Sequence, residues 1–125
     1  MPLECGARAE LHHVVTDADT AIALRSGDVA VLGTPKVIAL CEQVAVQAIA
    51  GSLPPGQVTV SMRVQLDHLQ PTAVGIEVTA EAVLERIEGR RLTFHVAVND
   101  PRGLVATGRV TRVVVDSDRF LEKSR

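Results

Sequence analysis

The stretch 34-TPKVIALCEQVAVQAIAG-51 predicts the helix on which the fold depends. Thr34 is a good N-cap, and Pro35 suits the first helical position because proline lacks the N–H that would be left unpaired there. The helix should end near Gly51, since the Ser-Leu-Pro-Pro-Gly run that follows cannot continue it. Apolar residues occupy almost every side of this helix, which is typical of a buried one.

One residue departs from this pattern. Glu42 lies in the middle of the helix and is the only formal charge between Lys36 and Arg63. A carboxylate in apolar surroundings needs a charged or hydrogen-bonding partner. Glu42 is therefore the first candidate for a functional residue.

After the Pro-Pro-Gly turn the apolar period changes from 3.6 residues to two, which predicts a strand over residues 57–68. The odd positions of this strand are polar. The even positions are predicted to form its buried face, and they are Val58, Val60, Met62, Val64, Leu66 and His68. His68 is thus a second polar residue in register with an apolar face.

Further strands are predicted over residues 74–86, 92–98 and 104–115, joined by Ile-Glu-Gly-Arg-Arg and Asn-Asp-Pro-Arg-Gly turns. Upstream of the helix, residues 9–15 read as a first strand, followed by a possible short helix after Asp17 or Asp19. Residues 116–123 are expected to close the chain as a second short helix.

This order of elements allows few folds. The four later strands are joined by short turns and should be antiparallel, and the long helix is the only element able to cover their apolar faces. We therefore predict one α+β domain over residues 1–125, a hot-dog fold in which an antiparallel sheet of about five strands wraps around one central helix. The edge strands need a partner, which predicts a homodimer.

Composition narrows the classes of function. The 125 residues are 46% hydrophobic and 22% charged, with a net charge of −2, no Trp and no Tyr, so nucleic acid is not an expected partner. The sequence shows no signal peptide and no stretch that could span a membrane, which favours a cytoplasmic protein. Cys5 and Cys41 fit no metal-ligand spacing and are expected to be free thiols.

Glu42 and His68 are expected to reach one site where the helix meets the sheet. Such a pair suits acid–base or nucleophilic chemistry, because burial raises the pKa of a carboxyl group and a nearby imidazolium or hydroxyl lowers it. The structural alternative is that Glu42 only bonds a neighbour and that His68 is a satisfied core residue. Two such residues on elements that must pack together favour a site.

Four segments resemble the fluoroacetyl-CoA thioesterase-like branch of the hot-dog thioesterases: VLGTPKVIALCEQ, LDHLQPTAVG, EGRRLTF and VVVDSDRFLEK. The resemblance covers about Val14 to Lys123. It implies that Thr34, Glu42 and His68 form the active site. It also implies that an acyl-CoA thioester is hydrolysed to a carboxylic acid and free CoA, with no cofactor and no metal.

The roles of these residues stay open at this stage. Glu42 could attack the thioester carbonyl or activate a water, with His68 moving protons at the leaving thiolate and Thr34 donating a hydrogen bond. Eight helical residues at about 1.5 Å each place Thr34 about 12 Å from Glu42. Thr34 would then join the site only through a non-helical lead-in or from a partner subunit, unless it is simply an N-cap.

Some positions depart from the family pattern. An aromatic lid should lie just before Thr34, but the Arg-Ser-Gly-Asp-Val-Ala-Val-Leu-Gly run there contains no ring, so fluoroacetyl-CoA is not the predicted substrate. Of a Thr-His-Glu-Arg run common among relatives, only Arg112 remains. Arg112 and the hairpin residues Arg90 and Arg91 are candidate substrate contacts, although charges on a turn are more often solvated.

Two other classes of function fit the same fold. One is a non-catalytic acyl-CoA binder or ligand sensor, which would bind without turnover. The other is a hot-dog dehydratase or hydratase, whose chemistry also uses a histidine with a carboxylate, but its usual motif spacing is absent here.

Overall fold

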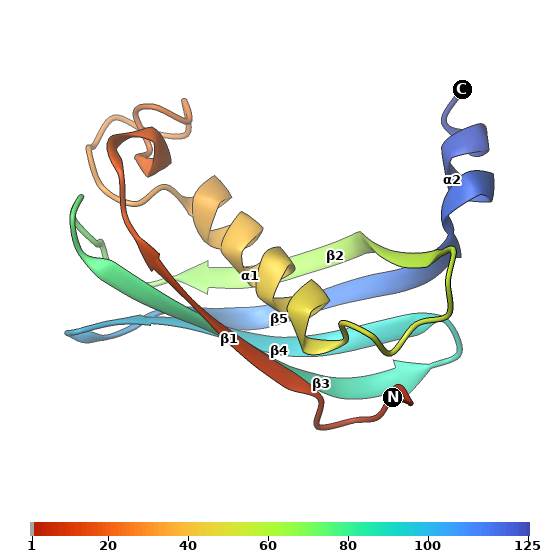
Figure 1. Cartoon of the computed structure of the whole chain (residues 1–125). Helices are drawn as coiled ribbons and strands as arrows, with labels where there is room; N and C mark the ends of the chain where they lie inside the picture. Colours follow the sequence, from red (N-terminus) through yellow and green to blue (C-terminus); the bar gives the residue numbers. More distant parts are fainter. Residues whose placement is uncertain (1) are drawn as a thin grey trace.

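The chain was analysed in a computed structural model that describes residues 2–125. An antiparallel sheet of five strands wraps around one long helix, α1 (Thr34–Ala48), as the sequence predicts (Figure 1). The strands are β1 (Arg8–Val14), β2 (Gln57–His68), β3 (Glu77–Glu88), β4 (Arg91–Asp100) and β5 (Gly103–Asp116). A 3₁₀ turn over Asp17–Asp19 follows β1, and α2 (Ser117–Lys123) follows β5.

The sheet has the order β1-β3-β4-β5-β2, and every neighbouring pair is antiparallel. β1 and β2 are therefore the edge strands. The α1 helix crosses one face of the sheet and buries its apolar side chains there (Figure 1). The residues at this contact include Val37, Leu40, Val44, Val78, Leu84, Phe94, Val96 and Val110.

The two cysteines are free, as expected from the sequence. Cys5 is exposed, whereas Cys41 lies on the buried face of α1. Burial, with a smaller effect from the neighbouring Glu42, raises the pKa of the Cys41 thiol to about 12. Cys41 therefore serves as a small apolar side chain rather than a nucleophile.

The helix begins one residue earlier than expected. Gly33 is the N-cap, Thr34 is the first helical residue and Pro35 the second. The prediction that Thr34 caps the helix is therefore wrong, and its hydroxyl is available for another contact. The third strand was also predicted to begin too early, because residues 74–76 form a turn before β3 rather than part of it.

The predicted buried face of β2 is wrong in its first half. The pairing of β2 with β5 shifts between Ser61 and Arg63, which leaves Met62 as an extra residue in a bulge. A bulge reverses the alternation of side chains along a strand. Val58 and Met62 are more than two-fifths exposed, and the polar Thr59 and Ser61 point toward α1 instead.

Within residues 2–125, no helix is long and apolar enough to cross a membrane.

Candidate active site

Thr34 and His68 meet at one end of α1. The Thr34 Oγ1 atom lies 2.7 Å from His68 Nδ1, which joins the first residue of the helix to the last residue of β2. Desolvation lowers the pKa of His68, against a smaller opposing effect of a hydrogen bond with the backbone of Gln70. The ring is therefore neutral near pH 7 and able to accept a proton.

The other ring nitrogen of His68 has no partner. Nε2 is buried, and no residue of the described chain donates to it or accepts from it. Buried polar atoms in folded proteins are nearly always paired, so an unpaired one calls for an explanation. Nε2 is therefore available to a hydrogen-bonding group from outside the described chain.

Asp19 fixes the start of α1. The Asp19 carbonyl accepts the N–H of Gly33 at 2.9 Å, and its carboxylate lies 3.7 Å from the Lys36 ammonium. The same carboxylate accepts from the N–H of Thr16 at 2.8 Å and lies 2.7 Å from His13 Nε2. These contacts join β1 to the first turn of α1, which begins at Thr34.

Glu42 belongs to a separate cluster. Its Oε2 atom accepts hydrogen bonds from the Ser61 hydroxyl and, at 3.3 Å, from Nη1 of Arg112. Arg112 is only 7% exposed and also donates to Ser61 Oγ, to Thr59 Oγ1 and to the Thr59 carbonyl, at 2.9, 2.8 and 2.8 Å. Burial lowers the pKa of Arg112, and the neighbouring Glu42 carboxylate partly offsets this, so the guanidinium stays charged.

The Glu42 carboxylate is held but not enclosed. Its side chain is 33% exposed, and among residues 2–125 nothing donates to Oε1. Arg112 and Ser61 fix one oxygen, which leaves the other free to face a substrate. The sequence missed Thr59 and Ser61 because regular alternation assigned them to the opposite face.

The expected meeting of Glu42 and His68 does not occur within one chain. Glu42 contacts β2 at Ser61, and His68 lies seven residues further along that strand, about 23 Å at the usual rise. On α1 the two clusters are about 12 Å apart, because the helix runs unbroken from Thr34 to Glu42. No hydrogen bond joins the clusters within the described residues.

Comparison with known proteins identifies the family. The model of the fluoroacetyl-CoA-specific thioesterase family matches residues 15–118. The chain belongs to this family. It is a hot-dog thioesterase, and the family supports acyl-CoA thioesters as its class of substrate.

Relatives of this thioesterase support the same assignment. The fluoroacetyl-CoA thioesterase of Streptantibioticus cattleyicolor is 32% identical over 95 residues, which is 76% of this chain and 68% of that protein. A solved fluoroacetyl-CoA thioesterase structure superposes with a TM-score of 0.94 at 27% identity, covering 100% of this chain and 97% of that one. A hot-dog-like protein from Thermanaerovibrio acidaminovorans gives 0.89 at 30% identity, covering 96% and 89%. The predicted hot-dog fold is confirmed.

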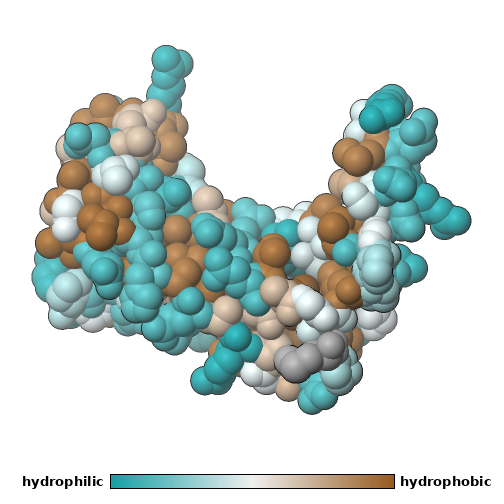
Figure 2. Space-filling model, in the orientation of Figure 1, coloured by the Kyte–Doolittle hydropathy of each residue, from teal (hydrophilic) through white to brown (hydrophobic). Residues whose placement is uncertain are grey.

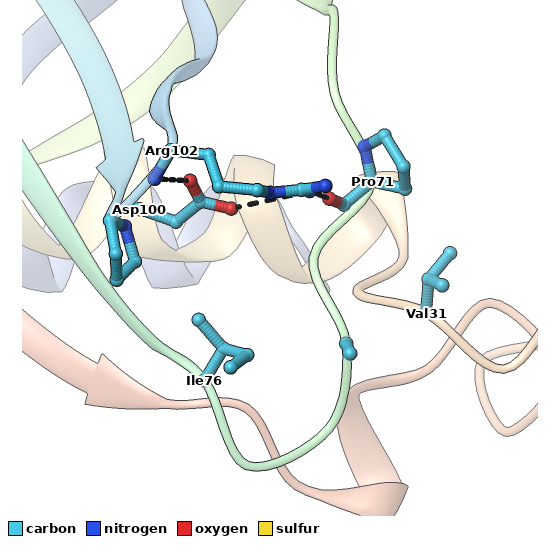
Figure 3. A pocket seen from close by; sticks show the side chains of 7 residues that line it. Val31, Pro71, Ile76, Asp100 and Arg102 are labelled. Carbon is cyan, nitrogen blue, oxygen red and sulfur yellow. Dashed lines mark hydrogen bonds and ion pairs between the residues drawn. The ribbon is translucent and has the colours of Figure 1, made fainter.

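A hollow of about 300 Å³ opens beside Thr34 and His68 in the thioesterase, and its walls include Val29, Val31 and Pro71. Val31 and Pro71 also line a neighbouring groove of about 350 Å³, which is mostly apolar (Figure 3). Arg102 closes one side of this groove by donating to the Pro71 carbonyl and pairing with Asp100 (Figure 3).

The three arginines predicted as substrate contacts occupy different places in the thioesterase. Arg112 is buried against Glu42. Arg90 lines a surface pocket next to α2, and Arg91 lines another pocket together with Arg63 and Arg109.

In residues 2–125, no group of three or more His, Cys, Asp or Glu side chains is arranged to hold a metal ion.

Proposed function

We propose that this protein hydrolyses acyl-CoA thioesters with Glu42, His68 and Thr34, and that each active site is shared by two copies of the chain. The observation that carries the proposal is the separation of two half-sites. One holds a fixed carboxylate, Glu42, and the other holds a neutral imidazole whose buried Nε2 has no partner.

A two-fold axis can bring the half-sites together. β2 is an edge strand whose outer side pairs with nothing in the described chain. If two copies of β2 pair antiparallel, the Ser61 end of one lies opposite the His68 end of the other, with the axis near Val64. The Glu42 carboxylate would then approach the partner's His68. Thr34, which lies about 12 Å from Glu42 along the helix of one chain, would join the site from the partner subunit.

Such a site can perform the reaction in two ways. In the first, Glu42 Oε1 attacks the thioester carbonyl, CoA thiolate leaves, and water hydrolyses the resulting anhydride. In the second, Glu42 removes a proton from a water that attacks the carbonyl directly. Both give a carboxylic acid and CoA thiol. The neutral imidazole of His68, hydrogen-bonded to Thr34, takes up the proton that the attacking water loses, directly or through Glu42, and passes it to the leaving sulfur.

The oxyanion needs a positioned donor, and the start of α1 supplies one. The N–H groups of Lys36 and Val37 bond the Gly33 carbonyl, and Pro35 has none. The N–H of Thr34 has no acceptor among the described residues and lies at the positive end of the helix dipole.

The apolar walls beside Thr34 and His68 favour acyl groups larger than fluoroacetyl. The hollow and the adjoining groove together offer an apolar path, and no aromatic ring closes the segment before Thr34. Apolar acyl chains gain binding free energy from such walls.

The test is thiol release from short, branched, aromatic and long acyl-CoAs, comparing the native protein with Glu42→Gln. We expect release by the native protein and a loss of at least about 100-fold in the variant, because the amide can neither attack nor accept a proton. Circular dichroism and the melting temperature check that the variant is folded. Ligand-induced stabilisation without any release would instead identify a non-catalytic acyl-CoA binder.

A further inference from the structure

A pocket of about 550 Å³ lies where α2 leaves the sheet. Helix α2 rises from one end of the sheet on the side that carries α1, and a broad hollow separates it from the other end of the molecule (Figure 2). The pocket is lined by Gln57 of β2, by Arg90 of the turn between β3 and β4, by Val115, and by Arg119, Phe120 and Lys123 of α2.

The pocket gathers cations that form no ion pair, although Arg90 Nη1 donates to the Val114 carbonyl at 3.4 Å. Within residues 2–125, none of Arg90, Arg119 and Lys123 forms an ion pair with a carboxylate. The cations that do form one are Lys36, Arg86, Arg102, Arg109, Arg112 and Arg125.

One carboxylate also lines the pocket, and it is already occupied. Asp116 is the N-cap of α2, and its Oδ1 accepts the N–H of Arg119 at 3.2 Å. Three cations thus face one engaged carboxylate, in a chain whose net charge is −2. A local excess of positive charge on a weakly acidic protein attracts an anionic ligand.

The same pocket exposes one of the two aromatic rings of the chain. Phe94 is fully buried, whereas Phe120 on α2 is 42% exposed and lines the pocket between Arg119 and Lys123. An exposed aromatic face flanked by cations is a surface on which a nucleobase can stack.

The pocket lies on the same strand as the contact of Glu42 but at a distance from it. Glu42 contacts β2 at Ser61, and Gln57 lines the pocket four residues earlier on the same strand, about 13 Å away. In an acyl-CoA the phosphates and adenine are separated from the thioester by the extended pantetheine arm. A site for them must therefore lie at a distance from the catalytic carboxylate, as this pocket does.

We propose that the pocket formed by Arg90, Arg119, Phe120 and Lys123 binds the phosphorylated adenosine end of CoA. This inference rests on the proposed thioesterase function and assigns the carrier half of its substrate. The cations bind the phosphates, and Phe120 stacks on the adenine. Helix α2 is then part of the substrate-binding surface.

The experiment compares one acyl group on two carriers: CoA, and pantetheine, which lacks the nucleotide. The measured quantity is kcat/KM for acyl-CoA divided by kcat/KM for acyl-pantetheine, in the native protein, in Arg119→Glu and in Lys123→Glu. We expect this ratio to fall about fivefold in each variant through a higher KM for acyl-CoA, and less so at high salt. Arg8→Glu on β1 is the matched control, because it makes the same charge change at an exposed, unpaired arginine on the opposite edge of the sheet, and it should leave the ratio unchanged.

Calorimetric titration with CoA and with pantetheine provides a readout that does not depend on turnover. Native protein should bind CoA more tightly than pantetheine, and both pocket variants should reduce that preference about fivefold. An unchanged ratio and an unchanged preference would overturn the subsite. Native protein that hydrolyses neither thioester but keeps the preference for CoA would refute the thioesterase proposal and leave the subsite standing.

Discussion

At the scale of single residues, the side chains of the proposed active site differ in how firmly the chain holds them. Glu42 is fixed by Ser61 and Arg112 through one carboxylate oxygen. His68 is bonded by the Thr34 hydroxyl at Nδ1 and has a buried Nε2 without a partner. The chain thus supplies two donors to one oxygen of the carboxylate and leaves one nitrogen of the imidazole without a partner.

Thr34 is not the helix cap, and its hydroxyl bonds His68 instead. We expect Thr34→Ser to keep thioesterase activity within about threefold, and Thr34→Val to lose about 100-fold, because valine keeps the shape but cannot bond His68 Nδ1. Steady-state kinetics measure this, and equal melting temperatures show that both variants are folded. Comparable activity in the two variants would remove the hydroxyl from the mechanism.

Asp19 contributes stability that depends on pH. Burial alone would raise the pKa of Asp19, but hydrogen bonds from Thr16 and the contact with His13 lower it from 3.8 to about 2. Because the folded pKa lies below the unfolded one, the contribution is present above about pH 4 and is lost as the pH falls toward 2. We expect Asp19→Asn to lower the free energy of unfolding by about 2 kcal/mol at pH 7.

Urea denaturation of native protein and Asp19→Asn at pH 7, 4 and 3 measures this contribution. The difference between the two proteins should shrink as the pH falls. A difference that stays constant over this range would mean that packing, not ionisation, is what the substitution removes.

At the scale of the elements, the bulge in β2 decides what surrounds Glu42. The shift at Met62 turns Thr59 and Ser61 toward α1, where they meet Arg112 of β5. Beyond the bulge, Val64, Leu66 and His68 are on the inner face, as the alternation predicts. One extra residue therefore allows a single strand to supply the partners of Glu42 and also the imidazole.

The contact between β2 and β5 depends on Gly108. A Cβ atom there would lie 2.0 Å from the Gln65 carbonyl oxygen, so Gly108→Ala must push the two strands apart. Overpacking of this kind costs about 1–3 kcal/mol of folding free energy. We also expect lower kcat/KM, because His68 lies three residues beyond Gln65 on the displaced strand.

Gly27→Ala is the matched control for this substitution. Its new Cβ would meet only Ala21 Cβ at 3.5 Å, an ordinary contact, and should change stability by less than about 0.5 kcal/mol. Equal melting temperatures for the two alanine variants would contradict the close approach at Gly108.

At the scale of the whole molecule, the proposed site requires two copies of the chain. This arrangement predicts the result of mixing two inactive variants, Glu42→Gln and His68→Ala. A mixed dimer would contain one site with both substitutions and one site with neither. Unfolding an equal mixture and refolding it should therefore restore about a quarter of the native activity.

In the control, each variant is refolded separately, and the two are then combined under conditions that prevent subunit exchange. This mixture should remain inactive. Sedimentation velocity establishes whether dimers are present in each sample. If each site lay within one chain, every site in a mixed dimer would carry one substitution, and refolding would restore nothing.

The architecture could be predicted from the sequence, because the hydrophobic periodicity, the Pro-Pro-Gly and Gly-Arg-Arg turns and one largely apolar helix leave few ways to bury the apolar faces. The sequence also pointed to Glu42 and His68, since a polar residue in an apolar register is visible without coordinates. Tertiary structure decided what these residues contact. The bulge at Met62, the burial of Arg112 against Glu42 and the separation of the two half-sites all depend on strand register. A shift of one residue moves the following side chains to the other face of the sheet, and regular alternation along a single strand does not reveal where a bulge introduces that shift.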